Sequence, residues 1–330
     1  MPRVFSGIQP TGDPHLGNWI GAISRWADQQ LPGHFFCIVD MHAITFPKDP
    51  VELRTKTLEL AMWLFAAGID PDTATLFVQS HVREHSELAW ILNCTTQMGE
   101  LQRMVQFKEK SRGATSVGVG VFTYPVLQAA DILMYHAEQV PVGEDQRQHV
   151  ELTRDVAHRF NTRFGDTFTL PQATTPVAGA RVMDLQNPHA KMSKSAEGDA
   201  GTIMLVESEK RTAKKIMRAV TDSGSQVSAG PDKPGVSNLL DLLSAVTGTD
   251  LDTLQAQFEG KMYGEFKKDV AEAVNAYLHP ARSRYAELAK DPAEVQRMLA
   301  RGADRAREVA VDTMAVVREK VGFLPTGLCP

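Results

Sequence analysis

The sequence contains little cysteine and no arrangement of cysteines that would cross-link a fold. Its three cysteines, Cys37, Cys94 and Cys329, stand far apart and form no C-x-x-C pair. Neither a disulfide framework nor a zinc site is therefore expected. No uninterrupted apolar run is long enough to span a bilayer, and the first ten residues lack the basic-then-apolar order of a secretion signal. These absences predict a soluble, cytoplasmic protein without membrane attachment.

Two common nucleotide-binding signatures are also missing. There is no G-x-x-x-x-G-K-[ST] loop, which excludes a P-loop NTPase. The only G-x-G, at Gly118 and Gly120, lacks a third glycine and does not open a helix after a strand, so a nicotinamide dinucleotide site is poorly supported. The net charge of −5 argues against indiscriminate binding of phosphate backbones, although a local basic face is compatible with a nucleic-acid partner.

The first half of the chain alternates strand-like and helix-like segments. Apolar, β-rich runs cover 3–9, 34–40 and 73–80, and another strand is expected over 139–142. Helices are expected to begin at Asn18 and at Asp49–Pro50. Strands and helices in this order are typical of a parallel sheet with right-handed crossovers, so the predicted fold class is α/β.

The second half has a different character. Several segments after residue 200 carry the 3.6-residue period of helices, and no convincing strand lies between them. We therefore expect a helical domain, with a boundary close to residue 185. The Gly- and Ser-rich segment 111–120 is predicted to be a loop.

Polar residues follow the predicted strands where a parallel sheet binds its ligands. They are Gln9 to Gly12, Asp40 to His42, and Gly143 to Gln146. In PTGDPHLGN (10–18), glycines allow close approach of a ligand, and the start of a helix at Asn18 suits a phosphate group. A plain strand-to-helix turn with a capping residue explains the same segment equally well.

A second segment, PHAKMSKSAEG (188–198), favours the phosphate-binding interpretation when it is combined with PTGDPHLGN. Together they resemble the two nucleotide motifs of the class I aminoacyl-tRNA synthetases. Residues 15–18, HLGN, match the H-I-G-H-like turn, and residues 191–195 match K-M-S-K-S in full. Asn18 replaces the second histidine of that turn, which is usual in the tyrosyl/tryptophanyl branch. The segments FSGIQPTG, VDMHAIT, QFKEKS, TYPVLQAADIL, PVGEDQRQH and AVTDS are similar to the tryptophan-specific members of that branch.

The resemblance covers nearly the whole chain and implies a fold and an activity. The expected fold is a Rossmann-like catalytic domain over 1–184, followed by the KMSKS loop and a helical tRNA anticodon-binding domain over 185–330, whose last helix could return to the catalytic domain. The implied activity is the ATP- and Mg²⁺-dependent conversion of L-tryptophan to tryptophanyl-adenylate and its transfer to tRNA(Trp), by a homodimer. Alternatives are a tyrosyl-tRNA synthetase, a small-molecule nucleotidyltransferase with the same turn, and a non-catalytic paralogue.

The resemblance also implies which residues bind ATP. Lys191 and Lys194 would contact the pyrophosphate portion, with Lys110 approaching from another segment, because lysines remain protonated near neutral pH. A solvated charge cluster is the alternative for the loop, an ordinary helix surface for Lys110, and a helix cap for Asp145. No metal-ligating side chain is assigned. The implied ATP-binding residues are Gln9, Pro10, Thr11, His15, Gly17, Asn18, Gly143, Glu144, Asp145, Val182, Lys191, Met192, Ser193, Lys194 and Ser195.

An acid among apolar residues suggests how an indole ring could be recognised. Asp131 follows two alanines and precedes Ile132 and Leu133, so its burial is costly unless a donor reaches it. By resemblance that donor is the indole N–H, in a charge-assisted bond of roughly 1.5–3 kcal/mol. A surface acid is the alternative for Asp131, and a satisfied core histidine for His42. The implied tryptophan-binding residues are Phe5, Gly7, Gln9, His42, Tyr124, Gln128, Asp131, Val140, Val142 and Gln146.

Two details of the tryptophan-binding residues concern Tyr124 and Gln128. Tyr124, Gln128 and Asp131 share one face if 124–131 is helical, but Pro125 suits a first helical turn and could leave Tyr124 at the cap. Some relatives have methionine where this chain has Gln128, so this chain departs there from the apolar pocket wall that the resemblance implies.

Two surface segments are candidates for contacts with partners. The segment 86–104, SELAWILNCTTQMGELQRM, is rich in apolar residues and is the candidate dimer interface. Helix 207–220 is predicted to be basic on more than one side, and it could either meet phosphates or be simply solvated. Its basic residues are Lys210, Arg211, Lys214, Lys215 and Arg218.

Overall fold

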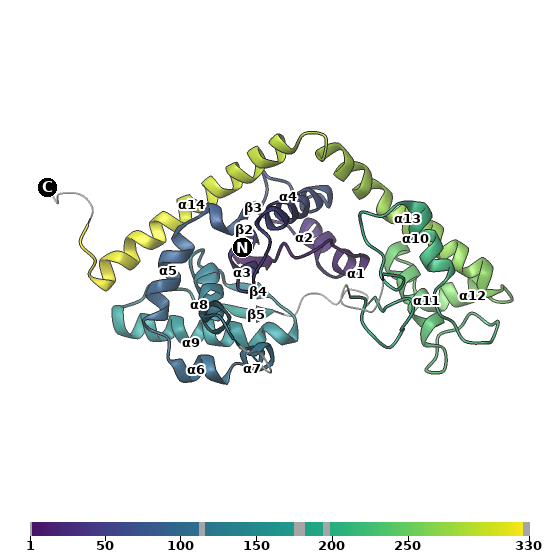
Figure 1. The fold of residues 1–330 in the computed structure, drawn as a ribbon, viewed down its shortest axis with the longest axis horizontal. Coiled ribbons are helices and arrows are strands. Elements are labelled where there is room, and N and C mark those ends of the chain that lie inside the picture. The colour runs from purple at the N-terminus through teal and green to yellow at the C-terminus, as the bar shows by residue number, and fades with distance from the viewer. Residues whose placement is uncertain (1, 112–115, 175–181, 194–198, 326–330) are drawn as a thin grey trace.

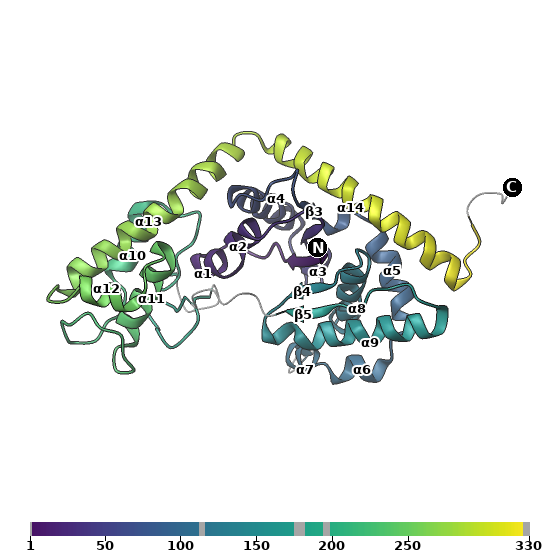
Figure 2. The same cartoon turned by 180° about the vertical axis from the view of Figure 1, so that it is seen from behind.

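A parallel five-stranded sheet forms the centre of the catalytic half (Figure 1, Figure 2). The computed structural model describes residues 2–111, 116–174, 182–193 and 199–325. The strands are β1 (Val4–Ile8), β2 (His34–Ile38), β3 (Thr75–Val78), β4 (Gln139–Pro141) and β5 (Gln172–Thr174), in the order β3-β2-β1-β4-β5. The first four strands lie inside the predicted ranges, and the short β5 was not predicted.

Helices cover both faces of the sheet, which explains the apolar sequence of β2. Phe36 and Ile38 pack into the core on one face of the sheet, whereas Phe35 and Cys37 pack into the core on the other. Neighbouring residues of a strand point to opposite faces, so a strand buried on both faces needs apolar residues throughout. The helices of this half are α1 (Leu16–Asn18), α2 (Ser24–Asp28), α3 (Asp40–Ala43), α4 (Pro50–Ala66), α5 (Glu84–Asn93), α6 (Met98–Arg103), α7 (Val105–Ser111), α8 (Val119–Leu133) and α9 (Arg147–Phe164).

The start of the first helix differs from the prediction. His15, not Asn18, is the N-cap, and Asn18 is the third helical residue. A π-helical segment, η1 (Trp19–Ile23), connects α1 to α2 without a break. Asp49 caps α4 as predicted, since its side chain accepts from the N–H groups of Val51 and Glu52. The predicted loop 111–120 ends earlier than expected, because α8 already begins at Val119.

The remaining helices form the other end of the molecule and then return to the sheet. In Figure 1 the α10–α12 group lies at one end, and α13 and α14 run from it across to the catalytic half. A Cβ at Gly302 of α14 would overlap the carbonyl oxygen of Leu76 in β3, so α14 lies directly on the sheet. These helices are α10 (Glu209–Met217), α11 (Pro234–Thr247), α12 (Leu251–Gln257), α13 (Tyr263–Leu288) and α14 (Pro292–Val321).

Candidate active site

The strand order reverses between β1 and β4, and a cavity of about 230 Å³ lies there. Such a switch point at the carboxyl ends of parallel strands is the usual ligand position in this class of fold. All ten residues predicted to bind tryptophan line this one cavity, although they come from four separate stretches of the chain, at 5–9, 42, 124–131 and 140–146. The cavity is also lined by Ser6, Val39, Gln106, Ile132 and Pro141, which were not predicted.

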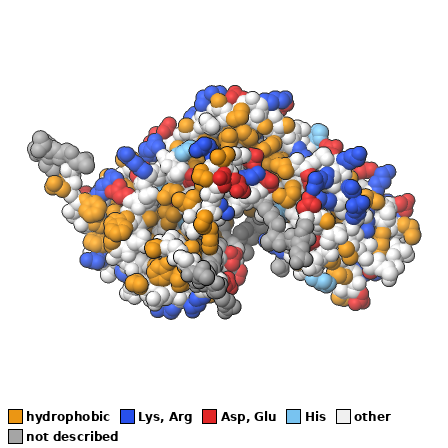
Figure 3. Space-filling view, viewed as in Figure 1, with side chains coloured by type: hydrophobic (Ala, Val, Ile, Leu, Met, Phe, Trp, Pro, Cys, Tyr) orange, Lys and Arg blue, Asp and Glu red, His pale blue; other side chains and the backbone are white. Residues whose placement is uncertain are grey.

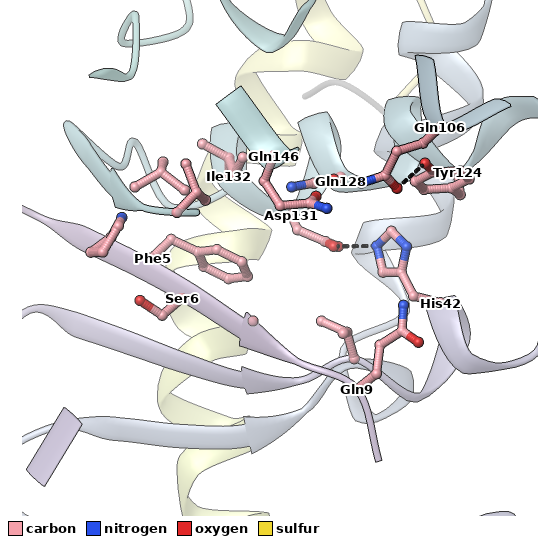
Figure 4. Close-up of a pocket in the computed structure, with 15 residues that line it drawn as sticks. Phe5, Ser6, Gln9, His42, Gln106, Tyr124, Gln128, Asp131, Ile132 and Gln146 are labelled. Atoms are coloured by element: carbon pink, nitrogen blue, oxygen red, sulfur yellow. Dashed lines mark hydrogen bonds and ion pairs between the residues drawn. The ribbon is translucent and has the colours of Figure 1, made fainter. Parts of the chain in front are cut away.

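Asp131 lies in the wall of this cavity and is 1% exposed (Figure 4). Its Oδ2 lies 2.8 Å from Nε2 of His42, while its Oδ1 lies 2.7 Å from both Nε2 of Gln79 and Nδ1 of His85. Burial opposes ionisation, but the hydrogen bonds from the two histidines outweigh it and lower the pKa of Asp131. The surface-acid alternative is therefore wrong, and the cavity contains an ionised acceptor.

A second polar group lies at the rim of the cavity. The hydroxyl of Tyr124 lies 3.0 Å from Oε1 of Gln106 and 3.1 Å from Nε2 of His149. Nδ1 of His149 lies 2.8 Å from Oε1 of Gln146, whose Nε2 donates to Asp145 at 2.8 Å. Burial and the negative charge of Asp145 raise the pKa of Tyr124 to about 12, so its hydroxyl remains protonated. Neutral and acidic acceptors at this rim can bind an ammonium group.

The helix α8 holds Tyr124 in place by an arrangement that the sequence did not indicate. Pro125 lies inside α8 rather than in its first turn, so Tyr124 is a mid-helix residue and the alternative that placed it at the cap is wrong. Tyr124, Gln128 and Asp131 line the cavity together, as their helical spacing predicted.

A second cavity, of about 420 Å³, lies beside the first. Its wall includes the predicted nucleotide residues Gln9, Thr11, His15, Asn18 and Ser193. Gln9 lines both cavities, so the two spaces meet at the end of β1. Ligands bound in the two cavities would therefore approach one another at Gln9.

The HLGN turn (residues 15–18) is held together by its own side chains. Nδ1 of His15 accepts from the Asn18 N–H at 3.3 Å, and Oδ1 of Asn18 accepts from the His15 N–H at 3.2 Å. A Cβ at Gly17 would lie 3.1 Å from the imidazole of His15, so glycine gives the ring its space. Asparagine at position 18 thus completes a reciprocal cap at the helix start.

The KMSKS loop (residues 191–195) begins from a short pairing of backbone segments. Lys191 forms a β-bridge with Met183, and the Met192 N–H donates to the carbonyl of Val182 at 3.0 Å. Met192 is buried, whereas Lys191 is exposed. Asn238 of α11 accepts from the Met183 N–H at 3.0 Å and donates to its carbonyl at 3.1 Å. The start of the loop is therefore fixed to the helical half.

Backbone hydrogen bonds join the segment after the loop to the HLGN turn. The Leu16 N–H donates to the carbonyl of Ile203 at 2.8 Å, and the Leu205 N–H donates to that of Pro14 at 3.0 Å. A Cβ at Gly17 would also lie 3.7 Å from that of Met192, so the two nucleotide motifs, more than 170 residues apart in sequence, are direct neighbours.

The other predicted nucleotide residues have varied positions. Pro10 is buried next to Gln9, and Gly143, Glu144 and Asp145 lie at or in a 3₁₀ turn, η3 (Glu144–Gln146). The N-cap of α9 is Gln146, so the alternative that Asp145 caps that helix is wrong. Lys194, Ser195 and the side chain of Lys110 lie outside the described residues.

Sequence reasoning missed several polar residues around the site. Gln79 and His85 are fully buried and contact Asp131, while Gln106 and His149 contact Tyr124. The available signal was weak, because a buried polar group needs partners but its sequence does not say which. Lys215 was also misjudged, since it is buried, with its Nζ 2.8 Å from Glu207 and donating to the carbonyl of Thr202 at 2.7 Å.

The chain also matches a known protein family. The family model described as tRNA synthetases class I (W and Y) matches residues 1–279, so the chain belongs to this family of class I tRNA synthetases. Tryptophan--tRNA ligase 2 of Streptomyces avermitilis is 52% identical, and the alignment covers 98% of each chain. The tryptophan--tRNA ligase of Mycobacterium leprae is also 52% identical, over 98% of this chain and 97% of its own.

Solved structures agree with this assignment. The tryptophanyl-tRNA synthetase of Campylobacter jejuni, complexed with ADP and tryptophan, aligns with a TM-score of 0.85 at 37% identity, over 97% of this chain and 100% of that one. The enzyme of Mycoplasma pneumoniae aligns with a TM-score of 0.84 at 35% identity, over 98% of each chain. The predicted fold class and the predicted tryptophanyl, bacterial-type branch are thereby confirmed.

Proposed function

We propose that this chain activates L-tryptophan with ATP and transfers it to tRNA(Trp). The observation that carries the proposal is the pair of cavities that meet at Gln9. One contains a buried acceptor for an indole N–H, and the other is bordered by the HLGN turn and Ser193 of the KMSKS loop. The family and the tryptophan-specific relatives support the same reaction.

The proposed reaction needs alignment rather than a protein nucleophile. The tryptophan carboxylate attacks the α-phosphorus of ATP, the bond to the bridging oxygen breaks, and pyrophosphate leaves. Holding both substrates at Gln9 makes this an effectively intramolecular step. Lys191 and Lys194, with Lys110, would stabilise the charge that develops on the pyrophosphate. The assignment of these lysines rests on the motif.

The amino acid and the nucleotide would each be bound by groups described above. Asp131 would accept from the indole N–H between Phe5, Gly7, Val140 and Val142, and Tyr124 and Gln146 would contact the amino acid's polar end. The start of the helical segment 16–28 would face the phosphates, because helix N-termini favour anions. The Mg²⁺ that accompanies ATP is proposed to bind phosphate oxygens, as is common in nucleotide sites.

The helical half and the catalytic half would serve different parts of the reaction. We propose a division at residues 184 and 185, with tRNA bound along the helical half. Figure 3 shows basic side chains gathered over the end of the molecule formed by α10 and α13. Lys210, Lys214 and Arg218 are exposed there and could meet tRNA phosphates, whereas the buried Lys215 could not.

We further propose a homodimer that works in the cytoplasm. Trp90 and Met98 are 68% and 67% exposed on the α5–α6 surface, and exposed apolar groups of this size mark interaction sites. In the part of the chain that the structure describes, no helix has the length and apolar character needed to cross a membrane.

Exchange of labelled pyrophosphate into ATP tests the central proposal. We expect exchange to depend on tryptophan, and charging of tRNA(Trp) to follow when that tRNA is added. Exchange that depends on tyrosine would favour the tyrosyl alternative. Exchange with none of the twenty amino acids would reject the proposal.

A further inference from the structure

Two buried side chains hold Asp131 from outside the amino-acid cavity. Gln79 and His85 are both 0% exposed, and neither lines the cavity. Each places a nitrogen 2.7 Å from Oδ1 of Asp131. The third partner, His42, lines the cavity and contacts Oδ2 instead.

The protons in this cluster can be assigned from its partners. Oε1 of Gln79 accepts from the Met41 N–H at 3.1 Å, so the other end of the amide, Nε2, must donate to Asp131. An ionised carboxylate only accepts, so Nδ1 of His85 carries the hydrogen. Nε2 of His85 then accepts from the hydroxyl of Tyr135, which lies 2.7 Å away. Each of these four hydrogen bonds therefore pairs one donor with one acceptor.

The assignment makes the two carboxylate oxygens unequal. Oδ1 receives two hydrogen bonds and is filled, since each oxygen offers about two acceptor sites. Oδ2 receives one, from His42, and keeps one acceptor site.

We propose that Gln79 and His85 are positioning residues for amino-acid specificity. By filling and orienting Oδ1, they leave Oδ2 as the single acceptor for a ring N–H in the cavity. This inference rests on the proposed function, because it assumes that the cavity binds tryptophan.

Gln79 and His85 together form what we call the clamp on Asp131. The clamp should affect discrimination between tryptophan and its analogues more than it affects the overall binding of amino acids. An analogue without the ring N–H leaves Oδ2 desolvated and unpaired, and a site built for one donor rejects such ligands strongly. Without the clamp the carboxylate can turn away or take up a proton, and the site then tolerates the analogue better. The apolar slot itself would remain.

The test compares tryptophan with an analogue whose ring N–H is replaced by sulfur. The quantity measured is kcat/KM for tryptophan divided by kcat/KM for the analogue, both in pyrophosphate exchange. In His85→Leu we expect this ratio to fall about 10-fold, mainly through a higher KM for tryptophan, with the KM for ATP nearly unchanged. In His85→Asn the amide can replace Nδ1 as the donor, and most of the discrimination should return. Gln79→Met, of similar volume, should lower the ratio without altering the histidine.

His136→Asn is the matched control. His136 is a partly buried histidine whose Nε2 lies 3.1 Å from a hydroxyl, that of Thr313, and it lines neither cavity. Its φ of 51° is one that asparagine tolerates. The ratio should be unchanged in this variant.

The clamp is refuted by an unchanged ratio in both His85→Leu and Gln79→Met, or by equal losses for the two amino acids and ATP. If one of the two variants does not fold, the other decides alone. A wild-type protein that activates no tryptophan would instead reject the proposed function, and this is measured first.

Discussion

At the scale of single residues, Asp131 shows how partners outweigh burial. A carboxylate that is 1% exposed would ordinarily have a raised pKa, but hydrogen bonds from His42 and His85 reverse the direction. Because its folded-state pKa is lowered, the charge is present at neutral pH and is lost only as the pH falls through that lowered value. The acceptor is therefore constant over the physiological range.

Asp131→Asn should weaken tryptophan far more than ATP. The amide keeps the shape of the side chain but loses the charge, and at least one of the former donors then faces an N–H group, whichever oxygen the nitrogen replaces. We expect the KM for tryptophan to rise about 10- to 100-fold, with a small change in the KM for ATP, measured by pyrophosphate exchange. Asp155→Asn, an exposed acid on α9, is the control. Equal changes in both KM values would contradict the assigned role of Asp131.

At the scale of elements, the KMSKS loop depends on a helix that contributes nothing to either cavity wall. Asn238 of α11 forms two hydrogen bonds with the backbone of Met183, which pairs with Lys191. The loop therefore starts from a fixed position even though the lysine itself is exposed.

Asn238→Ala should impair use of ATP rather than of tryptophan. The backbone of Met183 would lose both hydrogen bonds with the Asn238 side chain, and Lys191 would no longer start from a fixed backbone. We expect single-turnover adenylate formation to slow about 10-fold and the KM for ATP to rise, with the KM for tryptophan nearly unchanged. Gln255→Ala, which releases the Ala229 N–H in the loop before α11 but leaves Asn238 and its two hydrogen bonds in place, should leave the rate unaltered. A normal rate in Asn238→Ala would show that the loop needs no such anchor.

A pair of glycine substitutions tests how closely α14 lies on the sheet. In Gly302→Ala the new methyl group would overlap the Leu76 carbonyl of β3, whereas at Gly264 of α13 nothing lies within 4 Å. We expect Gly302→Ala to destabilise the protein by about 1–3 kcal/mol in urea unfolding. Gly264→Ala should be neutral or slightly stabilising, because alanine favours helix. Equal stability of the two variants would mean that α14 packs less tightly.

At the scale of the whole molecule, the proposed dimer predicts the effect of a surface charge. Trp90→Asp places a carboxylate at the most exposed large apolar side chain of α5. We expect its dimer dissociation constant, measured by sedimentation, to rise about 30-fold or more. Val311→Asp, at a site 44% exposed on α14, is the control. A wild-type monomer would refute the dimer, and an unaffected Trp90→Asp dimer would refute this interface.

One buried and one partly buried histidine should make stability depend on pH. Burial lowers the pKa of His34, and burial with the nearby charge of Arg3 lowers that of His136. Between these lowered values and the unfolded value of about 6.5, the unfolded chain binds more protons, so stability rises with pH. The double variant His34→Gln, His136→Asn should show a flatter pH dependence in urea unfolding near pH 6. An unchanged slope would contradict this origin.

The prediction from sequence was most successful where a function depends on contiguous residues. The HLGN and KMSKS segments are short, so their resemblance was visible without coordinates, and the alternation of strands and helices indicated the parallel sheet. Local capping was harder to predict. Asn18 is a good N-cap residue, yet His15 takes that position because its imidazole also accepts from the backbone.

The amino-acid sequence by itself determined the alternation of the first four strands with helices and the two nucleotide motifs, because both are set by neighbouring residues. Only the tertiary structure decided that Gln79 and His85 meet Asp131, that Lys215 is buried, and that Asn238 holds the start of the KMSKS loop. The contacts of Asp131 and Asn238 join residues 46 to 55 positions apart, and Lys215 is buried against partners that composition does not reveal. Packing of distant segments, rather than local sequence preference, selects such partners.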